Sequence, residues 1–206
     1  MSSHHPFKIP EHLKAKFPEG KIPILKCISY TDYSLRNFFN QIKNQAWFNN
    51  TLFVITADHT GYPNSEYNTH GAGNFEIPIL FFDPGAALKG KNNIVTQQID
   101  ILPGVMDYLG YPNDYFAFGN NPFDTLRTGW NINYNSGTYC YITENDLLYF
   151  DGNKTIGYYK WRNDSTLQIN RKDSAKSETI PSETAMKIFL QVYSASLRKN
   201  KMTLSH

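Results

Sequence analysis

The chain has 206 residues, which is enough for one sizeable hydrophobic core or for a core with a small satellite. Hydrophobic residues make up 40% of it and charged residues 18%, a composition that excludes a disordered chain. The net charge is only +2, with acids and bases mixed along the sequence, so nothing calls for a nucleic-acid partner. The longest apolar runs are too short to cross a bilayer and no signal-peptide pattern opens the sequence, so we expect the chain itself to be soluble.

The first predicted element is a helix in the N-terminal quarter. Residues 6–23 are irregular and carry prolines and lysines, which indicates a surface loop. From about Ile28 the pattern becomes helical, and the pair Asn49 and Asn50 closes it. The apolar residues that share one face of this helix are Leu35, Phe38, Phe39, Ile42 and Ala46.

Two strands and a second helix follow. Residues 51–57 form a continuous β-branched and aromatic run, typical of a strand buried on both sides in a sheet that helices cover. Residues 77–82 form another such run, which ends at the turn residues 83–85. Residues 100–109 predict a helix, with Asp100 as its cap and a glycine directly after its end.

The character of the sequence changes near residue 122. A last helix follows the polar loop 170–181. We therefore divide the chain into an α/β part, residues 1–122, and a small antiparallel sheet with a helix, residues 123–206. The strand-like runs that predict this antiparallel meander are residues 130–134, 139–142, 147–150 and 155–161. The apolar face of the last helix contains Met186, Phe189, Leu190, Tyr193 and Leu197.

Cysteines and meander aromatics have a plain structural interpretation. Cys27 and Cys140 lie among apolar residues and outside any Cys-x-x-Cys pair, which indicates two buried free thiols, although a disulfide is left open. The meander aromatics could face a glycan, but alternation along a strand places half of them in a core regardless. We expect core packing for Trp130, Tyr139, Tyr141 and Trp161.

Asp58 and His59 come directly after the predicted strand 51–57. Ligands of open α/β sheets bind beyond the carboxyl ends of the strands, and a turn at that point lets two consecutive side chains converge. A carboxylate oxygen and an imidazole nitrogen suit Mn²⁺ or Zn²⁺. Two ligands are not a complete site, and the alternative interpretation is that Asp58 caps a turn while His59 is a solvated loop residue.

Four segments in order resemble the alkaline phosphatase–sulfatase superfamily, and in particular its lipoteichoic acid synthase-like branch of phosphoglycerol transferases. The opening stretch SSHHPF resembles the Ser-x-His-x-Pro-Phe segment of that branch, and YTDYSLRNFF resembles the helix before its Asp-His strand. NTLFVITADHT, followed by IPILFFDPG and QQIDILPGVMDYLGY, completes the match. The resemblance runs from the first residues to about residue 119 and implies the C-terminal part of an alkaline phosphatase-like α/β sandwich, followed by the meander and helix.

The resemblance implies one divalent metal, manganese in the expected case, with Mg²⁺, Zn²⁺ or Ca²⁺ as alternatives. It maps two metal ligands onto Asp58 and His59 and a substrate-binding histidine onto His4. For His4 the alternative is an expression tag, since MSSHH resembles one, and His5 is the fallback. The family's Glu ligand and Thr nucleophile precede these segments and have no match in this sequence, and the Cys-x-Pro-x-Arg motif of true sulfatases is also absent.

Two further residues are candidate metal ligands, because two-metal relatives use a later histidine and an aspartate in this region. We expect His70 to be a loop histidine instead. We expect Asp32 to be a buried aspartate that satisfies a nearby donor, because it shares a helix face with Ile28, Leu35 and Phe39.

The sequence thus predicts a fragment of a metal-dependent enzyme that acts on phosphate esters, inactive by itself because its nucleophile lies elsewhere. The alternatives are a fragment of a true sulfatase and a non-catalytic half-domain. The resemblance implies a lipid-linked phosphate- or sulfate-ester substrate and a membrane-anchored parent with an extracytoplasmic catalytic domain. Because half of a sheet leaves an unpaired edge, we also expect self-association through that edge.

Overall fold

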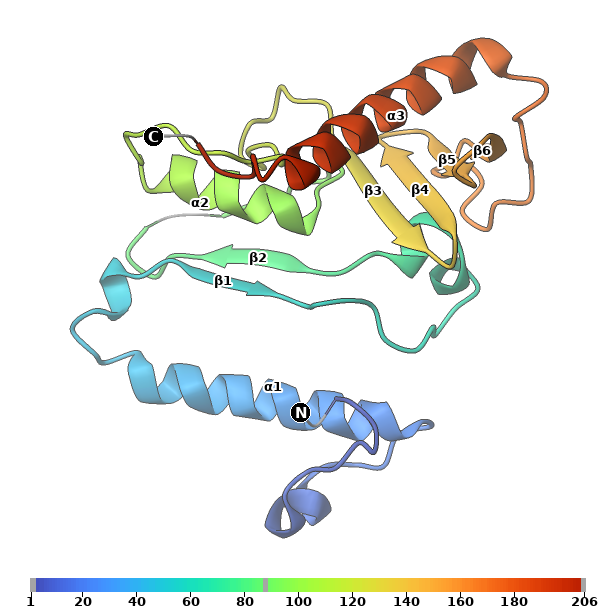
Figure 1. Ribbon diagram of the computed structural model, residues 1–206. Helices are drawn as coiled ribbons and strands as arrows, with labels where there is room; N and C mark the ends of the chain where they lie inside the picture. Colours follow the sequence, from blue (N-terminus) through green and yellow to red (C-terminus); the bar gives the residue numbers. More distant parts are fainter. Residues whose placement is uncertain (1–2, 87–88, 205–206) are drawn as a thin grey trace. The chain divides into compact units, whose positions relative to one another are not determined.

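The computed structural model describes residues 3–86 and 89–204 (Figure 1). The chain divides into two compact units. The first consists of Met1–Val54 with Phe81–Leu88, and the second of Ile55–Leu80 with Lys89–His206. Every helix among the described residues is too short or too polar to span a bilayer.

The main element of the first unit is helix α1, Pro23–Ile42. It begins about five residues before the predicted start, because Pro23 stands in the first turn, where its fixed φ suits a helix and its missing N–H costs nothing. A short 3₁₀ helix, Glu11–Lys16, interrupts the segment predicted as a loop. Cys27 is fully buried, and its thiol donates to the carbonyl oxygen of Phe7 at 3.2 Å.

A group of half-buried aromatic rings packs together in the first unit. The ring of Phe39 on α1 lies 5.2 Å from that of Phe53 and 5.7 Å from that of Phe82, centroid to centroid. Phe48 joins the same group at 5.6 Å from Phe53. These edge-to-face and tilted contacts are the geometry that aromatic pairs prefer.

Strands β1, Phe53–Thr56, and β2, Ile79–Phe82, pair into a two-stranded sheet. The prediction that they are buried on both sides is wrong for the described residues. β1 is half-buried, and exposure alternates along β2, where Leu80 is 52% exposed. Among the described residues each strand has one neighbouring strand only.

The second unit contains a four-stranded antiparallel meander in the order β3-β4-β5-β6, as predicted (Figure 1). The hairpin between β3 and β4 turns at Ser136 and Gly137, whose φ values of 49° and 85° are those of a type I′ turn. The bounds of the strands are Trp130–Asn135, Thr138–Thr143, Leu147–Phe150 and Thr155–Tyr159.

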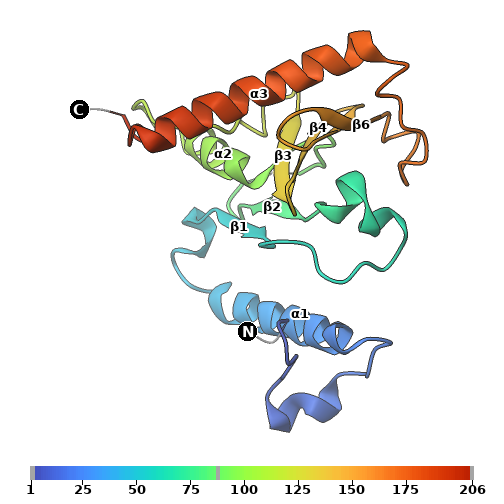
Figure 2. The same ribbon diagram turned by 45° about the vertical axis from the view of Figure 1, so that its right-hand side comes forward.

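Helix α3, Lys176–Arg198, lies along one face of this meander in both views (Figure 2). Its Met186 is fully buried against Tyr141, Leu148, Phe150 and Tyr158. The opposite face buries Cys140, Ile142 and Leu147 beneath Ala72, Phe75 and neighbouring side chains. The core packing predicted for the meander aromatics is confirmed, with Trp130, Tyr139 and Tyr141 in the first cluster and Trp161 in the second.

Helix α2, Ile101–Tyr108, agrees with the prediction for residues 100–109, and Gly110 follows it with a φ of 62°. Asp100 stands at the predicted N-cap position of α2, but its side chain makes no capping bond to that helix. It is instead the third residue of the preceding 3₁₀ turn η5, Gln98–Asp100, whose N-cap is Gln97. Its carboxylate accepts from the backbone N–H of Gln97 at 3.0 Å while the Gln97 side chain reaches the N–H of Asp100, which is a capping box. Asp100 is fully buried and also accepts from the N–H of Asn120 at 2.7 Å.

Candidate functional site

Asp58 and His59 lie together where the chain leaves β1. The Oδ2 atom of Asp58 is 3.6 Å from Nε2 of His59, and the two side chains are 82% and 73% exposed. The other carboxylate oxygen of Asp58 accepts from the backbone N–H of His59 at 3.0 Å, which holds the carboxylate folded back toward its neighbour. The structure therefore brings the two predicted ligands together on one exposed tip.

The hydrogen bond of the His59 ring determines which nitrogen is available. Nδ1 lies 2.7 Å from the carbonyl oxygen of Thr60. Because a carbonyl oxygen can only accept, Nδ1 carries the hydrogen, and in the neutral ring Nε2 keeps its lone pair. Metal-binding histidines are characteristically oriented in this way, with the second ring nitrogen donating to a backbone carbonyl or a carboxylate. The nitrogen that keeps its lone pair, Nε2, is thus the one that lies 3.6 Å from Oδ2 of Asp58.

The pair fits part of a divalent metal's coordination shell. Metal–ligand bonds of about 2.1 Å place two ligand atoms roughly 3.4 Å apart at a tetrahedral angle, close to the 3.6 Å between Oδ2 and Nε2. One carboxylate and one imidazole suit manganese and zinc alike. Among residues 3–86 and 89–204 no group of three or more His, Cys, Asp or Glu side chains could hold a metal ion.

Two side chains that the sequence did not single out hold the backbone around the pair. The carboxamide nitrogen of Gln98 donates to the carbonyl oxygens of Ala57 at 2.8 Å and Asp58 at 3.1 Å. The hydroxyl of Thr60 donates to the carbonyl oxygen of Asn74 at 2.7 Å. Every residue has a backbone carbonyl, so the amino-acid sequence does not indicate which carbonyl a side chain will bind. The one sequence feature that sets Gln98 apart is its place just before the predicted helix 100–109.

His4 and His5 belong to the first unit, whereas Asp58 and His59 belong to the second. His4 is exposed in a turn in which its carbonyl oxygen accepts from the N–H of Phe7 at 2.6 Å. The His5 ring lies 4.2 Å from the ring of Phe7, centroid to centroid. The role of His4 in substrate binding stays a prediction.

The other two candidate ligands, His70 and Asp32, have local partners. His70 follows the 3₁₀ turn Tyr67–Thr69, and its Nε2 lies 3.0 Å from the Thr69 hydroxyl, which agrees with a loop histidine. The expected burial of Asp32 is wrong, because its side chain is 70% exposed and pairs with Arg36 at 3.4 Å across one helical turn. Ile28 and Leu35 on the same helix face are exposed as well, whereas Phe39 packs against Phe53 and Phe82, so the spacing predicted the face but not which part of it is buried.

Comparison with known proteins defines the class. Residues 1–111, more than half of the 206, match the family model described as Sulfatase, and the chain therefore belongs to the sulfatase family. All of the chain superposes, with a TM-score of 0.72 and 19% identity, on 49% of a crystal structure of a protein in the alkaline phosphatase superfamily from Vibrio parahaemolyticus. The predicted fold, part of an alkaline phosphatase-like α/β structure with an antiparallel sheet and a C-terminal helix, is confirmed.

Among curated proteins the chain is similar to lipoteichoic acid synthase of Staphylococcus aureus. In strains USA300 and NCTC 8325 the identity is 24% over 154 residues, which cover 63% of this chain. The match spans 24% of the synthase, so the chain corresponds to about a quarter of the length of that relative and to about half of the Vibrio protein.

Proposed function

We propose that this chain is the C-terminal portion of the catalytic domain of a metal-dependent enzyme that transfers or hydrolyses phosphate esters, similar to a phosphoglycerol transferase. The observation that carries the proposal is the exposed pair that follows β1, where Oδ2 of Asp58 and Nε2 of His59 lie 3.6 Å apart. The similarity to lipoteichoic acid synthase supports phosphate rather than sulfate chemistry.

In this proposal Asp58 and His59 supply two metal ligands, and the Thr60 carbonyl keeps the His59 ring in the binding tautomer. A bound divalent ion, manganese in the expected case, neutralises phosphate charge and lowers the pKa of a hydroxyl nucleophile. His4 donates to a phosphate oxygen, where charge grows during phosphoryl transfer. The nucleophilic Thr and a Glu ligand, as the resemblance implies, come from a segment outside these 206 residues.

The second candidate is a fragment of a true sulfatase, which the family match itself favours. The sequence that precedes Met1 in the gene discriminates the two. A Thr in a small-residue context supports the transferase, and a Cys-x-Pro-x-Arg motif supports the sulfatase.

The further expectations are a lipid-linked ester substrate and a membrane-anchored parent whose catalytic domain is extracytoplasmic. For the isolated chain we expect self-association through the edges of β1 and β2, which a strictly monomeric sedimentation profile would contradict.

A titration of the 206-residue chain with Mn²⁺, followed by the EPR signal of the free ion, tests the site directly. We expect weak binding by the wild type, because two protein ligands make an incomplete shell. Asp58→Ala and His59→Ala should each weaken it roughly tenfold or more. Asp173→Ala and His12→Ala are matched controls, since both side chains are exposed and lie outside the proposed site. Wild-type affinity in both site variants would refute the proposal.

An activity assay distinguishes the fragment from a complete enzyme. With Mn²⁺ and a chromogenic phosphodiester, we expect no turnover by the chain above that of His59→Ala, because the nucleophile is missing. Clear turnover that His59→Ala abolishes would overturn the assignment as an inactive portion and retain the metal site.

A further inference from the structure

Gln98 makes an unusual long-range contact for an exposed side chain. Its single carboxamide nitrogen is hydrogen-bonded to two consecutive backbone carbonyls, those of Ala57 and Asp58, which precede it by 41 and 40 residues. The two distances, 2.8 and 3.1 Å, are those of well-formed hydrogen bonds. The NH₂ group has two hydrogens, so both bonds form without sharing one.

These two carbonyls define the geometry of Asp58. Each belongs to a planar peptide unit, one before and one after the Cα atom of Asp58, and a planar unit turns as a whole when its carbonyl turns. Fixing both units fixes φ and ψ of Asp58 together, the only two soft backbone dihedrals there. The directions in which Asp58 and His59 leave the backbone follow from these angles. The side chain of Gln98 is therefore bonded to both peptide units of the backbone from which Oδ2 approaches Nε2 to 3.6 Å.

Gln98 itself sits on a rigid support. It is the first residue of η5, whose capping box between Gln97 and Asp100 satisfies two N–H groups that a helix start leaves free. Asp100 is fully buried and also accepts from the N–H of Asn120. The guanidinium of Arg127, 6% exposed, lies 3.5 Å from the same carboxylate.

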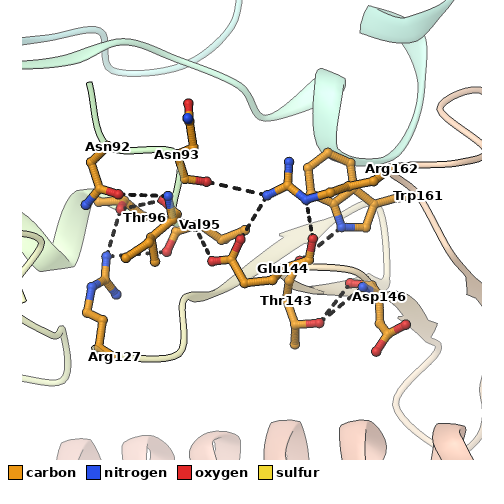
Figure 3. Close-up of polar contacts among 11 residues, drawn as sticks. Asn92, Asn93, Val95, Thr96, Arg127, Thr143, Glu144, Asp146, Trp161 and Arg162 are labelled. Atoms are coloured by element: carbon orange, nitrogen blue, oxygen red, sulfur yellow. Dashed lines mark hydrogen bonds and ion pairs between the residues drawn. The ribbon is translucent and has the colours of Figure 1, made fainter. Parts of the chain in front are cut away.

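The segment just before η5 is tied to the meander (Figure 3). Figure 3 shows Glu144, in the turn after β4, accepting from the N–H of Val95, at 2.7 Å, and pairing with Arg162 at 2.9 Å. From the other side Arg127 donates to the hydroxyl of Thr96 at 2.7 Å and to the carbonyl of Val95 at 3.4 Å. Arg162 also donates to the carbonyl of Asn93 at 3.4 Å. The meander thus anchors residues 93–96, and these lead directly into Gln98.

The chemistry of the contact calls for glutamine. A glutamate of the same shape would turn two acceptors toward two carbonyls, and a lysine would bring a positive charge next to a cation site. An asparagine has the right group on a stem one methylene shorter. A neutral double donor at this reach holds the carbonyls without competing for, or repelling, a metal ion.

We propose that Gln98 is a positioning residue for the Asp58–His59 pair. In this proposal the hydrogen bonds between the meander and residues 93–96 restrain Gln98, and Gln98 in turn restrains the backbone of Asp58. The proposal deepens the proposed function, on which its metal-related part rests. Gln98 touches neither metal nor substrate in this scheme, and it acts only through the backbone carbonyls on either side of Asp58.

The test compares Gln98→Leu with Gln168→Leu in the full chain. The carboxamide of Gln168 donates to the carbonyl oxygen of Thr166, two residues away on an exposed loop, so this control makes the same chemical change at a local contact. In metal-free protein, amide hydrogen exchange by NMR at His59 and Thr60 should be faster in Gln98→Leu alone. In the Mn²⁺ titration Gln98→Leu should bind roughly five- to tenfold more weakly than the wild type. Gln98→Glu, measured by exchange only, should resemble Gln98→Leu, because it keeps the shape and removes the donors.

The outcomes separate the two ideas. Wild-type exchange and wild-type Mn²⁺ affinity in Gln98→Leu, with affinity lost in Asp58→Ala and His59→Ala, would overturn the positioning role and keep the metal site. If Asp58→Ala and His59→Ala bind Mn²⁺ as tightly as the wild type does, the proposed function fails. In that case only the amide exchange rates in metal-free protein test whether Gln98 positions the pair. Faster exchange in Gln168→Leu as well would also overturn it, because the effect would then be non-specific.

Discussion

The phenol oxygen of Tyr149 accepts a hydrogen bond from the backbone N–H of Gly71 at 3.0 Å. Tyr149 lies on β5 and Gly71 in the loop that follows the Asp58–His59 pair, so this bond joins the loop to the meander. Burial, before all other causes, raises the pKa of Tyr149 to about 12, so the hydroxyl stays protonated at neutral pH. Gly71 has a φ of 51°, and a Cβ there would lie 2.9 Å from Leu167 Cδ1.

Gly71→Ala should therefore be destabilising twice over, through its backbone angle and through the clash with Leu167. We expect the free energy of unfolding, measured by urea denaturation, to fall by about 2–3 kcal/mol. Gly137→Ala is the control, because its φ is 85° but an added Cβ would meet nothing within 4 Å. It should cost only about 1 kcal/mol. Equal losses in the two variants would show that the contact with Leu167 has no energetic weight.

Gly119→Ala should displace the support of Gln98. An added Cβ would overlap the carbonyl group of Ile99 and lie 2.7 Å from the backbone nitrogen of Asp100. Backbone atoms of η5 cannot move aside as a flexible side chain can, so we expect a loss of more than about 2 kcal/mol in unfolding free energy. If the variant folds, amide exchange at His59 should rise as it does in Gln98→Leu. A stable variant with unchanged exchange would contradict the tight approach of residue 119 to η5.

Glu144 should contribute more to stability than its ion pair alone suggests. Glu144→Ala removes the partner of the Val95 N–H as well as that of Arg162, and we expect a loss of about 1–2 kcal/mol. Arg162→Ala should cost less, about 0.5–1 kcal/mol, because the Arg162 side chain is 41% exposed. Asp173→Ala, which removes an exposed carboxylate 3.9 Å from Lys172, should change stability by less than about 0.5 kcal/mol. A double-mutant cycle on Glu144 and Arg162 measures the pair itself, and a larger loss for Arg162→Ala would contradict this ranking.

Glu183 should give the chain a dependence on acidic pH. Hydrogen bonds from Lys187, and then from Thr155, lower the pKa of this carboxyl below its usual 4.5. The folded state then binds fewer protons than the unfolded state, so this stabilisation is present above the unfolded pKa and is lost as the pH falls through the folded pKa. Glu183→Gln should cost about 0.5–1 kcal/mol at pH 7, and the difference from the wild type should vanish at the acidic end of a urea series. A difference that persists unchanged in acid would show that charge plays no part.

The two cysteines should be inert in the folded chain. Burial raises the pKa of the Cys27 thiol and raises that of Cys140 to about 12, and both residues are almost fully buried. The thiolate is the reactive form, so at pH 8 we expect Ellman's reagent to label neither thiol in native protein and both in 6 M guanidinium. Rapid labelling of one thiol in the native chain would contradict its burial.

The parts of the fold that the sequence predicted well depend on local patterns, namely turn residues, apolar spacing and β-branched runs. Turn residues such as Ser136 and Gly137 predicted the meander. The spacing of apolar residues along one helix face predicted α3. Strand β1, just before Asp58, is indicated by its β-branched and aromatic run. In these cases the physical cause lies within a few residues of its effect.

The failures have the opposite character. Asp32 shares a helix face with apolar residues, but the spacing of a helix does not say what covers that face. Gln98 is hydrogen-bonded to backbone carbonyl groups, which every residue has. The identity of the residue 40 positions earlier therefore could not predict this contact. The tautomer of His59 likewise depends on a carbonyl, that of Thr60.

The two predicted ligands are contiguous in the sequence, yet the parts that shape them are spread over more than one hundred residues, as far as Arg162. A minimal version of this chain that stops soon after β2 would retain Asp58 and His59 in order and lose the scaffold that aims them. A graft of the Asp-His strand into another protein must therefore include η5 and the residues that hold it, or supply equivalent hydrogen bonds to the carbonyls of Ala57 and Asp58.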